Sequence, residues 1–238
     1  MHLVHLIHDY SAIDHIVLVD NLSPDGSIEN LQKAVNNKID VIQSDRNGGY
    51  SYGNNYGAFY LIEKYNIDIL FIANPDVEFS EDFLIGIVSD MDRYNAQAAS
   101  VYMDMPKIAS GVVRNPKINS VLRETLDCTI LLKHIFLFIG AVLHKGGGVK
   151  QVEWIPDSLF AIDAKTYKEL NGMDNKVFLF YEKQIFGWKF IQAGYKMVID
   201  TDISYFHNHS VSINKSIKRY SQVKQFFHYS IFTRPTWG

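Results

Sequence analysis

The chain has 238 residues, of which 47% are hydrophobic and 21% are charged, and its formal net charge is −3. This length and composition predict one globular domain with a sizeable core, and the slightly acidic balance gives no reason to expect a nucleic-acid partner. The single cysteine, Cys128, excludes an intrachain disulfide and a cysteine-based metal cluster.

The start of the chain has no basic segment ahead of an apolar core, so we expect no signal peptide. The most apolar long stretch, residues 129–143, contains Lys133 and His134 and is too short to cross a bilayer. Both observations lead us to expect a cytoplasmic protein.

Helix and strand patterns alternate along the first part of the chain. Residues 3–10 have the helical spacing of apolar side chains, and residues 15–20 form an apolar run typical of a buried strand. A second helix pattern covers 28–35, and a short strand pattern covers 41–42. This alternation favours a parallel sheet, and because such a sheet normally opens with a strand, we expect that a strand is missing ahead of Met1.

A loop rich in glycine and asparagine comes next. Residues 45–57 contain four glycines and three asparagines and lie directly before a helix pattern that begins at Ala58. Glycine lets backbone N–H groups approach a ligand closely, and the N-terminus of a helix attracts negative charge. The loop matches neither the phosphate-loop nor the dinucleotide-binding pattern. It is therefore either a ligand-binding loop or a flexible connection.

A buried strand then ends at a carboxylate. Residues 69–73 form an apolar run typical of a strand buried on both faces, and the run stops at Asn74, Pro75 and Asp76. Pro75 has no N–H to donate, so the strand ends there and leaves Asp76 at its carboxyl end. Ligands bind at that end of strands in open α/β sheets, and such a carboxylate can hold a hard divalent cation. The alternative is a simple turn, because Asn-Pro-Asp is also favourable turn chemistry.

The regular pattern continues through one more helix and strand and then weakens. Ser80 is a good N-cap for a helix with an apolar stripe over 83–91, and 98–102 is a further strand. Between 103 and 153 the periodicity is lost. The apolar run 130–143 is open to three interpretations: a core helix, an acceptor-binding wall or a surface that rests on a membrane.

Regular patterns return after Trp154. Residues 155–163 are typical of a turn into a strand, and 164–170 of a short helix that Asn171 and Gly172 end.

An aromatic run over 177–181 leads to one carboxylate, Glu182, at the start of a helix pattern over 183–193. Desolvation raises the pKa of a carboxyl group in such a place, whereas the helix dipole lowers it. The group can serve as a general base, or it can simply stabilise the helix N-terminus. Position alone leaves both open.

Two short strands are predicted at 196–200 and 203–207, and His207 and His209 flank Asn208. If the strand continues, both imidazoles point to the same side. Neutral imidazole is a suitable ligand for a divalent metal such as manganese, although a histidine at a strand end is also a common surface residue that forms hydrogen bonds.

Residues 216–232 have helical spacing and combine basic with aromatic side chains. We expect a C-terminal helix docked on the body of the protein. The alternative is an interfacial helix that rests on an anionic membrane, which would place the protein peripherally on the inner face of the cell membrane.

Six motifs follow one another along the chain: Val-Asp-Asn-x-Ser at 19–23, Asn-x-Gly-Tyr-Ser-x-Gly-Asn-Asn at 47–55, Asn-Pro-Asp at 74–76, Phe-Leu-Phe-Tyr-Glu at 178–182, Ala-Gly-Tyr-Lys at 193–196, and His207. In this order and spacing they resemble family 2 glycosyltransferases, most closely the rhamnosyltransferase-like branch that builds bacterial surface polysaccharides. The resemblance spans residues 3–212. It implies the GT-A fold, an α/β architecture in which a Rossmann-like nucleotide-binding half and an acceptor half share one mostly parallel mixed sheet.

The resemblance also implies a division of the chain. We expect one domain over 1–212, with a nucleotide-sugar half over 1–102 and an acceptor half over 103–212. Residues 213–238 would form a helical tail.

The resemblance implies a role for each motif. Asp76 resembles the metal-binding Asp of the family, and His207 matches a late histidine that joins the metal or the diphosphate. Glu182 matches the acidic motif that supplies the catalytic base. The implied donor-binding residues are Asp20, Asn21, Ser23, Asn47, Gly48, Asn74 and Asp76.

The chain departs from the family pattern in three places. The family's opening strand, which lines the nucleotide pocket, is absent. The acidic motif is often Glu-Asp, whereas here Lys183 follows Glu182. Asp157 stands where the family usually has glycine, and we expect it to face the acceptor or the donor sugar.

These residues together predict an inverting glycosyltransferase that uses Mn²⁺ or Mg²⁺. The donor would be a UDP- or dTDP-linked sugar, and the acceptor a hydroxyl of a glycan or lipid-linked glycan. One base without a second carboxylate nucleophile fits a single displacement with inversion. The alternative, which the missing strand and Lys183 suggest, is a catalytically inactive GT-A-like binding module in a polysaccharide assembly complex. A nucleotidyltransferase fits less well, because the sequence has no basic glycine-rich phosphate loop.

Overall fold

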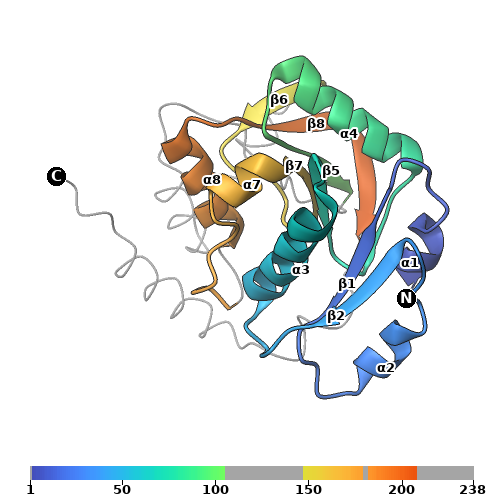
Figure 1. The fold of residues 1–238 in the computed structure, drawn as a ribbon. Coiled ribbons are helices and arrows are strands. Elements are labelled where there is room, and N and C mark those ends of the chain that lie inside the picture. Colours follow the sequence, from blue (N-terminus) through green and yellow to red (C-terminus); the bar gives the residue numbers. More distant parts are fainter. Residues whose placement is uncertain (1, 105–146, 179–181, 208–238) are drawn as a thin grey trace, which may run out of the picture.

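The structure is a computed structural model that describes residues 2–104, 147–178 and 182–207 (Figure 1). Its helices are α1 (His2–Ile7), α2 (Ser27–Gln32), α3 (Tyr50–Tyr65), α4 (Glu81–Tyr94), α7 (Ala164–Glu169) and α8 (Glu182–Ala193). Its strands are β1 (Ile16–Asp20), β2 (Ile39–Gln43), β3 (Ile69–Ala73), β4 (Val77–Glu78), β5 (Ala98–Asp104), β6 (Val149–Val152), β7 (Leu159–Asp163) and β8 (Met197–His207).

The described strands form a parallel pair and a larger mixed sheet. β1 and β2 run parallel, from Ile16 opposite Ile39 to Asp20 opposite Gln43. The larger sheet has the strand order β3-β7-β5-β8-β4, and β6 also pairs with β8. In this sheet β5 and β8 run parallel, whereas the other described pairs are antiparallel.

The expected α/β class with a mixed central sheet is confirmed, but the expected parallel majority does not hold for the described strands. β7 lies between β3 and β5 and runs opposite to both. Sequence periodicity predicts the type of each element but not its neighbours in space, so the alternation of strands and helices could not show that β7 enters the middle of the sheet.

β1 and β3 each have one edge without a described partner. β1 pairs with β2 alone, and β3 pairs with β7 alone, among the residues that the structure describes. Helix α3 packs against both strands. Among the described residues, α3 therefore bridges two separate sheets.

Helices cover both faces of the larger sheet and give three layers (Figure 1). Alternate residues of β7 enter two different cores, as the period of a strand requires. Leu159 and Ala161 pack in a cluster that contains side chains of α1 and α4. Phe160 and Ile162 pack in a second cluster with side chains of α3, α7 and α8. The larger sheet is thus buried between two helical layers.

Several elements differ from the sequence predictions. In β3, Leu70 and Ile72 are buried in one core cluster, and Ile69, Phe71 and Ala73 are partly buried against the other, so both faces of the strand pack on a core but one face is less completely buried. The two strands expected at 196–200 and 203–207 are one strand, β8, whose pairing with β5 shifts between Val101 and Tyr102. β4 and β6 were not predicted, because two to four residues are too short to show a period.

Other local predictions are confirmed. The Ser80 side chain accepts a hydrogen bond from the Phe83 N–H at 3.3 Å and caps α4. Asn171 and Gly172 adopt positive φ angles of 54° and 61° just beyond α7. The interpretations of 130–143, His209 and 216–232 concern parts of the chain outside the described residues. In the part that is described, no helix is long and apolar enough to span a membrane.

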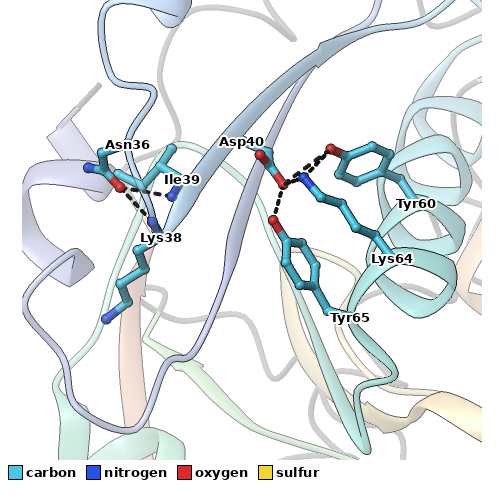
Figure 2. A network of polar contacts seen from close by, with 7 residues as sticks. All are labelled: Asn36, Lys38, Ile39, Asp40, Tyr60, Lys64 and Tyr65. Atoms are coloured by element: carbon cyan, nitrogen blue, oxygen red, sulfur yellow. Dashed lines mark hydrogen bonds and ion pairs between the residues drawn. The ribbon is translucent and has the colours of Figure 1, made fainter.

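A polar network fastens the C-terminal end of α3 to β2 (Figure 2). Asp40 Oδ2 accepts hydrogen bonds from the hydroxyl of Tyr65 at 2.6 Å and from that of Tyr60 at 3.2 Å. Lys64 Nζ lies 2.9 Å from the same oxygen. Because the three donors come from the last turns of α3, one carboxylate on β2 holds that end of the helix.

We predict that Asp40→Asn lowers the free energy of unfolding by about 1 to 2 kcal/mol at neutral pH, since hydrogen bonds to a charged group are stronger than neutral ones. The Tyr65 hydrogen bond is the main cause that lowers the pKa of Asp40 below its usual 3.8. A carboxyl group of this kind stabilises the fold above its unfolded-state pKa, and the contribution is lost as the pH falls through the folded-state value. Urea denaturation from pH 7 downward should therefore show the difference between wild type and variant shrinking below about pH 4. A difference that persists in acid would contradict the role of the charge.

Candidate functional site

Polar side chains gather where β1 and β2 end. Asp20 is the last residue of β1, lies opposite Gln43 of β2, and is 2% exposed. Its carboxylate accepts hydrogen bonds from Gln43 Nε2 at 2.7 Å, the Ser23 N–H at 3.2 Å and the Ser27 hydroxyl at 3.4 Å. Burial disfavours the ionised form, but these hydrogen bonds outweigh it and lower the pKa of Asp20. The carboxylate is therefore fixed in orientation at the carboxyl edge of the parallel pair.

Asn21 links this edge to the glycine-rich loop. Its side-chain amide donates to the Gly49 carbonyl at 2.9 Å and to Asn47 Oδ1 at 3.3 Å. Its side-chain oxygen accepts from the Ser44 hydroxyl at 3.0 Å. Gly48 lies between Asn47 and Gly49 in the same loop. Asn21 after β1 thus meets Asn47 and Gly49 ahead of α3. Helix α3 begins at Tyr50, not near Ala58 as expected, so residues 50–57 are helical and the loop before the helix is shorter than the sequence indicated.

The loop meets the segment ahead of Glu182 at Gly49. The N–H of Tyr50 donates to the Phe178 carbonyl at 2.9 Å. A Cβ atom at Gly49 would lie 2.2 Å from that carbonyl oxygen, and Gly49 has a φ of +86°. Only glycine lets the loop and this segment approach so closely. Phe178 stands four residues ahead of Glu182, so the contact brings the donor loop beside the segment that carries the acidic motif.

Glu182 is the first residue of α8 and is 3% exposed. Its carboxylate lies near the positive end of the helix dipole. The next side chain, Lys183, makes a cation–π contact with Trp154, and its Nζ lies 4.8 Å from the centre of the indole ring. The position that often holds a second acid in the family therefore holds a cation stacked on an aromatic ring.

Tyr50 connects the start of α3 to Asp157, because its hydroxyl donates a hydrogen bond to the Asp157 carbonyl. Burial, and after it the negative charges of Asp157 and Glu182, raise the pKa of Tyr50 well above the usual value. Both carboxylates therefore lie within electrostatic reach of one hydroxyl group. Asp157, which we expected to face a sugar, is half-buried at this place.

The pairing of β4 with β8 brings Asp76 and His207 together. Val77, the residue after Asp76, lies opposite His207 in the sheet. His207 Nε2 is 3.1 Å from Asp76 Oδ1, and the two side chains are 8% and 28% exposed, respectively. The sequence predicted both residues as metal ligands although 131 positions separate them. The structure places them in contact.

A carboxylate oxygen and an imidazole nitrogen are a donor pair that suits Mn²⁺, and the carboxylate also suits Mg²⁺. No group of three or more acidic, histidine or cysteine side chains that could hold a metal is found among the described residues. The pair fits a cation that completes its coordination with phosphate oxygens and water, as such cations commonly do.

Further contacts join this pair to the rest of the site. The hydroxyls of Tyr205 and Ser158 lie 2.5 Å apart, and the Asn74 N–H donates to the Ser158 carbonyl at 2.8 Å. Burial is the main cause that raises the pKa of Tyr205; the Ser158 hydrogen bond opposes it, and the charges of Asp157 and Asp76 add to it. The Asp157 carbonyl accepts from Tyr50, and the next residue, Ser158, contacts Tyr205 and Asn74, so the backbone at 157–158 links the start of α3 to the end of β3.

The sequence interpretation missed several residues that hold this arrangement together. Gln43 ends β2 and Ser44 follows it, and a polar residue at the carboxyl end of a strand is a signal that could have marked them. Tyr50 could have been noticed as the first residue of a helix after a glycine pair. Ser158 lies in the turn before β7 and Tyr205 lies inside β8, and nothing in the pattern marks either residue.

Three solved structures with a similar architecture are glycosyltransferases. The structure of GalNAc-T7 with UDP, GalNAc and Mn²⁺ has a TM-score of 0.64 at 16% identity, and the match covers 88% of this chain and 40% of that one. The mannosyltransferase PcManGT of Pyrobaculum calidifontis, solved with GDP-Man and Mn²⁺, has a TM-score of 0.61 at 14% identity, covering 98% and 60%. TarS of S. aureus with UDP-GlcNAc has a TM-score of 0.54 at 12% identity, covering 94% and 60%. The chain thus has the GT-A fold that the motifs implied.

The sequence then defines the family. The model of glycosyl transferase family 2 matches residues 3–140, more than half of the chain, and the chain belongs to this family. A relative is the low-salt glycan biosynthesis hexosyltransferase Agl10 of Haloferax volcanii, which is 25% identical over 205 residues. The match covers 84% of this chain, and the chain spans 61% of the length of that relative. The predicted family is confirmed.

We predict that Gly49→Ala destabilises the protein more than Gly26→Ala. Both positions have positive φ, but a Cβ at Gly26 would meet nothing within 4 Å, whereas one at Gly49 would collide with the Phe178 backbone. Gly26→Ala should therefore cost only the backbone strain of about 1 kcal/mol, and Gly49→Ala at least about 2 to 3 kcal/mol. Urea denaturation measures both. Equal losses would show that the contact between the loop and Phe178 is not tight in solution.

Proposed function

We propose that this chain is an inverting, metal-dependent glycosyltransferase that moves a sugar from a nucleoside-diphosphate sugar to a hydroxyl group of a glycan or lipid-linked glycan. The observation that carries the proposal is the series of contacts that runs from Asp20 through Gly49 and Asp157 to Asp76. It joins a donor loop, a metal-ligand pair and the buried carboxylate of Glu182. These are the parts that the transfer of a sugar requires.

We assign the nucleotide to the carboxyl edge of β1 and β2. Asp20, Asn21 and Ser23 would hold the nucleoside, and Asn47 and Gly48 would line the donor pocket. The fixed orientation of the Asp20 carboxylate supports this assignment, because a preorganised acceptor can select the hydroxyl or amide donors of a nucleoside. We expect UDP or dTDP, and the similar structures solved with UDP- and GDP-linked ligands support a nucleotide-sugar partner.

We assign the diphosphate to the edge formed by Asp76 and His207, with Asn74 beside them. These side chains would hold Mn²⁺ or Mg²⁺, and the bound ion supplies positive charge that stabilises the departing diphosphate. The Mn²⁺ in two solved structures of the same fold supports the use of a divalent metal.

We assign Glu182 as the base that takes the proton of the acceptor hydroxyl when its oxygen attacks the anomeric carbon. Lys183 cannot accept that proton, because its ammonium group is already protonated. This group makes a cation–π contact with Trp154 instead. Asp157 lies, like Glu182, within electrostatic reach of the Tyr50 hydroxyl, and we assign it to a hydroxyl of the donor or acceptor sugar. The relationship to a hexosyltransferase of glycan biosynthesis supports a glycan acceptor.

Our first prediction for this function is that Asp76→Asn abolishes metal-dependent donor binding, because it removes the charged ligand of the cation. Thermal-shift titrations with UDP, dTDP and GDP, each with and without Mn²⁺, should raise the melting temperature of wild type for one nucleotide in the presence of metal. Ligand at about 100 times Kd stabilises by about 2.7 kcal/mol, which is readily measured. Asp92→Asn, an exposed aspartate on α4, is the matched control and should respond like wild type.

If Asp76→Asn binds nucleotide and metal as well as wild type, the metal assignment is wrong. If wild type responds to no nucleotide, the alternative of a catalytically inactive binding module gains support.

The second prediction concerns the base. Glu182→Gln should keep donor affinity and lower turnover by about 10² to 10⁴-fold, because only proton transfer is lost. Release of nucleoside diphosphate through donor hydrolysis measures turnover without a known acceptor. Glu63→Gln, on the exposed face of α3, is the control. Unchanged turnover in Glu182→Gln would exclude Glu182 as the base.

A further inference from the structure

Asn55 forms an unusually complete set of hydrogen bonds in the middle of α3. The side chain is 3% exposed. Its Nδ2 donates to the Met173 carbonyl at 2.8 Å and to Asn175 Oδ1 at 2.6 Å. Its Oδ1 accepts from the Tyr167 hydroxyl at 2.5 Å and from the Met173 N–H at 2.9 Å. One buried amide therefore fixes the turn that follows α7.

The same turn is held from the other side by α8. Lys189 Nζ donates to the Leu170 carbonyl at 3.1 Å and to the Gly172 carbonyl at 2.7 Å. Gly172 has a φ of +61°, and a Cβ there would lie 2.3 Å from Asn55 Oδ1, so no larger residue fits between the turn and α3. The turn over residues 170–175 is clamped between two helices, by Asn55 of α3 and by Lys189 of α8. We call these two residues the turn clamp.

Together with the contact between Tyr50 and Phe178, the turn clamp holds the chain on both sides of Glu182. At the start of α3, Tyr50 binds the Phe178 carbonyl. One and a half turns further along α3, Asn55 binds the turn, and Lys189 binds the turn from two turns inside α8. Between these fixed points the chain runs through Phe178 to Glu182, the first residue of α8. The position of Glu182 relative to the donor loop is thus set by contacts on both sides of it.

The roles of Asn55 and Lys189 differ from the role of Glu182. Neither Asn55 nor Lys189 is among the residues that line the series of contacts from Asp20 to Asp76. The amide of Asn55 is fully occupied by four hydrogen bonds within the protein, so it has no capacity left to bind a substrate. A buried amide with this pattern serves to fix geometry.

We propose that Asn55 and Lys189 are positioning residues that hold the start of α8, and with it the carboxylate of Glu182, at a fixed distance from the donor loop. The proposal rests on the proposed function, in which Glu182 is the base. A displacement of a catalytic group by about 1 Å can lower the rate by about 100-fold. The hydrogen bonds of Asn55 and Lys189 go to residues 167–175 and not to the residues assigned to the donor, so we expect donor binding to be unaffected. The clamp therefore acts on turnover and not on donor affinity.

The test uses Lys189→Met and Asn55→Ser in the full chain, with donor hydrolysis as the assay. Lys189→Met keeps the length of the side chain but removes its hydrogen bonds, and it is the variant that should fold most readily. Both variants should lower kcat by about 10 to 100-fold and leave KM and Kd for the donor within about twofold. Lys189→Arg, which can still donate to the two carbonyls, should recover most of the lost kcat.

Asp40→Asn is the matched control, because Asp40 also fixes α3 (Figure 2). It holds the C-terminal end of the helix, whereas the contact with Phe178 is made at the other end, by Tyr50. Asp40→Asn should lower the melting temperature and leave kcat unchanged. If the clamp variants lose kcat and donor affinity together, in proportion to their losses of melting temperature, the clamp is only structural and the proposal is wrong. Full kcat in Lys189→Met and Asn55→Ser would also overturn it.

Hydrogen exchange separates this proposal from the proposed function. The clamp variants should accelerate amide exchange in the first two turns of α8, and Asp40→Asn should not. If wild type shows no turnover but exchange responds in this way, the assignment of Glu182 as base fails while the mechanical link from the clamp to α8 stands. Unchanged exchange at α8 in both clamp variants would show that no such link exists.

Discussion

The close contact between Gly49 and Phe178 is the constraint on which the arrangement of the site depends. It joins the loop after β2 to the segment ahead of α8, two parts of the chain that are more than a hundred residues apart. The contact is made by backbone atoms, with the Tyr50 N–H directed at the Phe178 carbonyl. Backbone contact at this distance requires the absence of a side chain, which explains a glycine with positive φ at the start of a long helix.

Two carboxylates of the candidate site are each held by a partner from another element. Burying a charge without partners is costly, and the hydrogen bonds of Asp20 and Asp76 offset that cost. Asp20 is held from β2 and from the turn after β1. Asp76 faces His207 because β4 pairs with β8. The fold thus fixes the orientation of the Asp20 and Asp76 carboxylates, and the proposed function depends on such fixed charges because they can stabilise a reaction electrostatically.

Helix α3 contributes both to the candidate site and to the stability of the fold, through contacts at different points along its length. Its first turn supplies Tyr50 to the site, its middle supplies Asn55 to the turn clamp, and its last turns bind Asp40. The three contacts face different parts of the protein. A change at one end of the helix can therefore alter its attachment to β2 without moving the acidic segment at the other end.

The sequence by itself determined the elements and the kind of chemistry. Apolar periodicity marked the helices and most strands, carboxylates at a strand end and a helix start marked Asp76 and Glu182, and the resemblance of the motifs marked Asp20, because all these signals depend on residues that are adjacent along the chain. Only the tertiary structure decided which strands pair and which side chains meet. The contact of Asp76 with His207, the place of β7 inside the sheet and the clamp by Asn55 arise from elements distant in sequence, whose order in space no local pattern encodes.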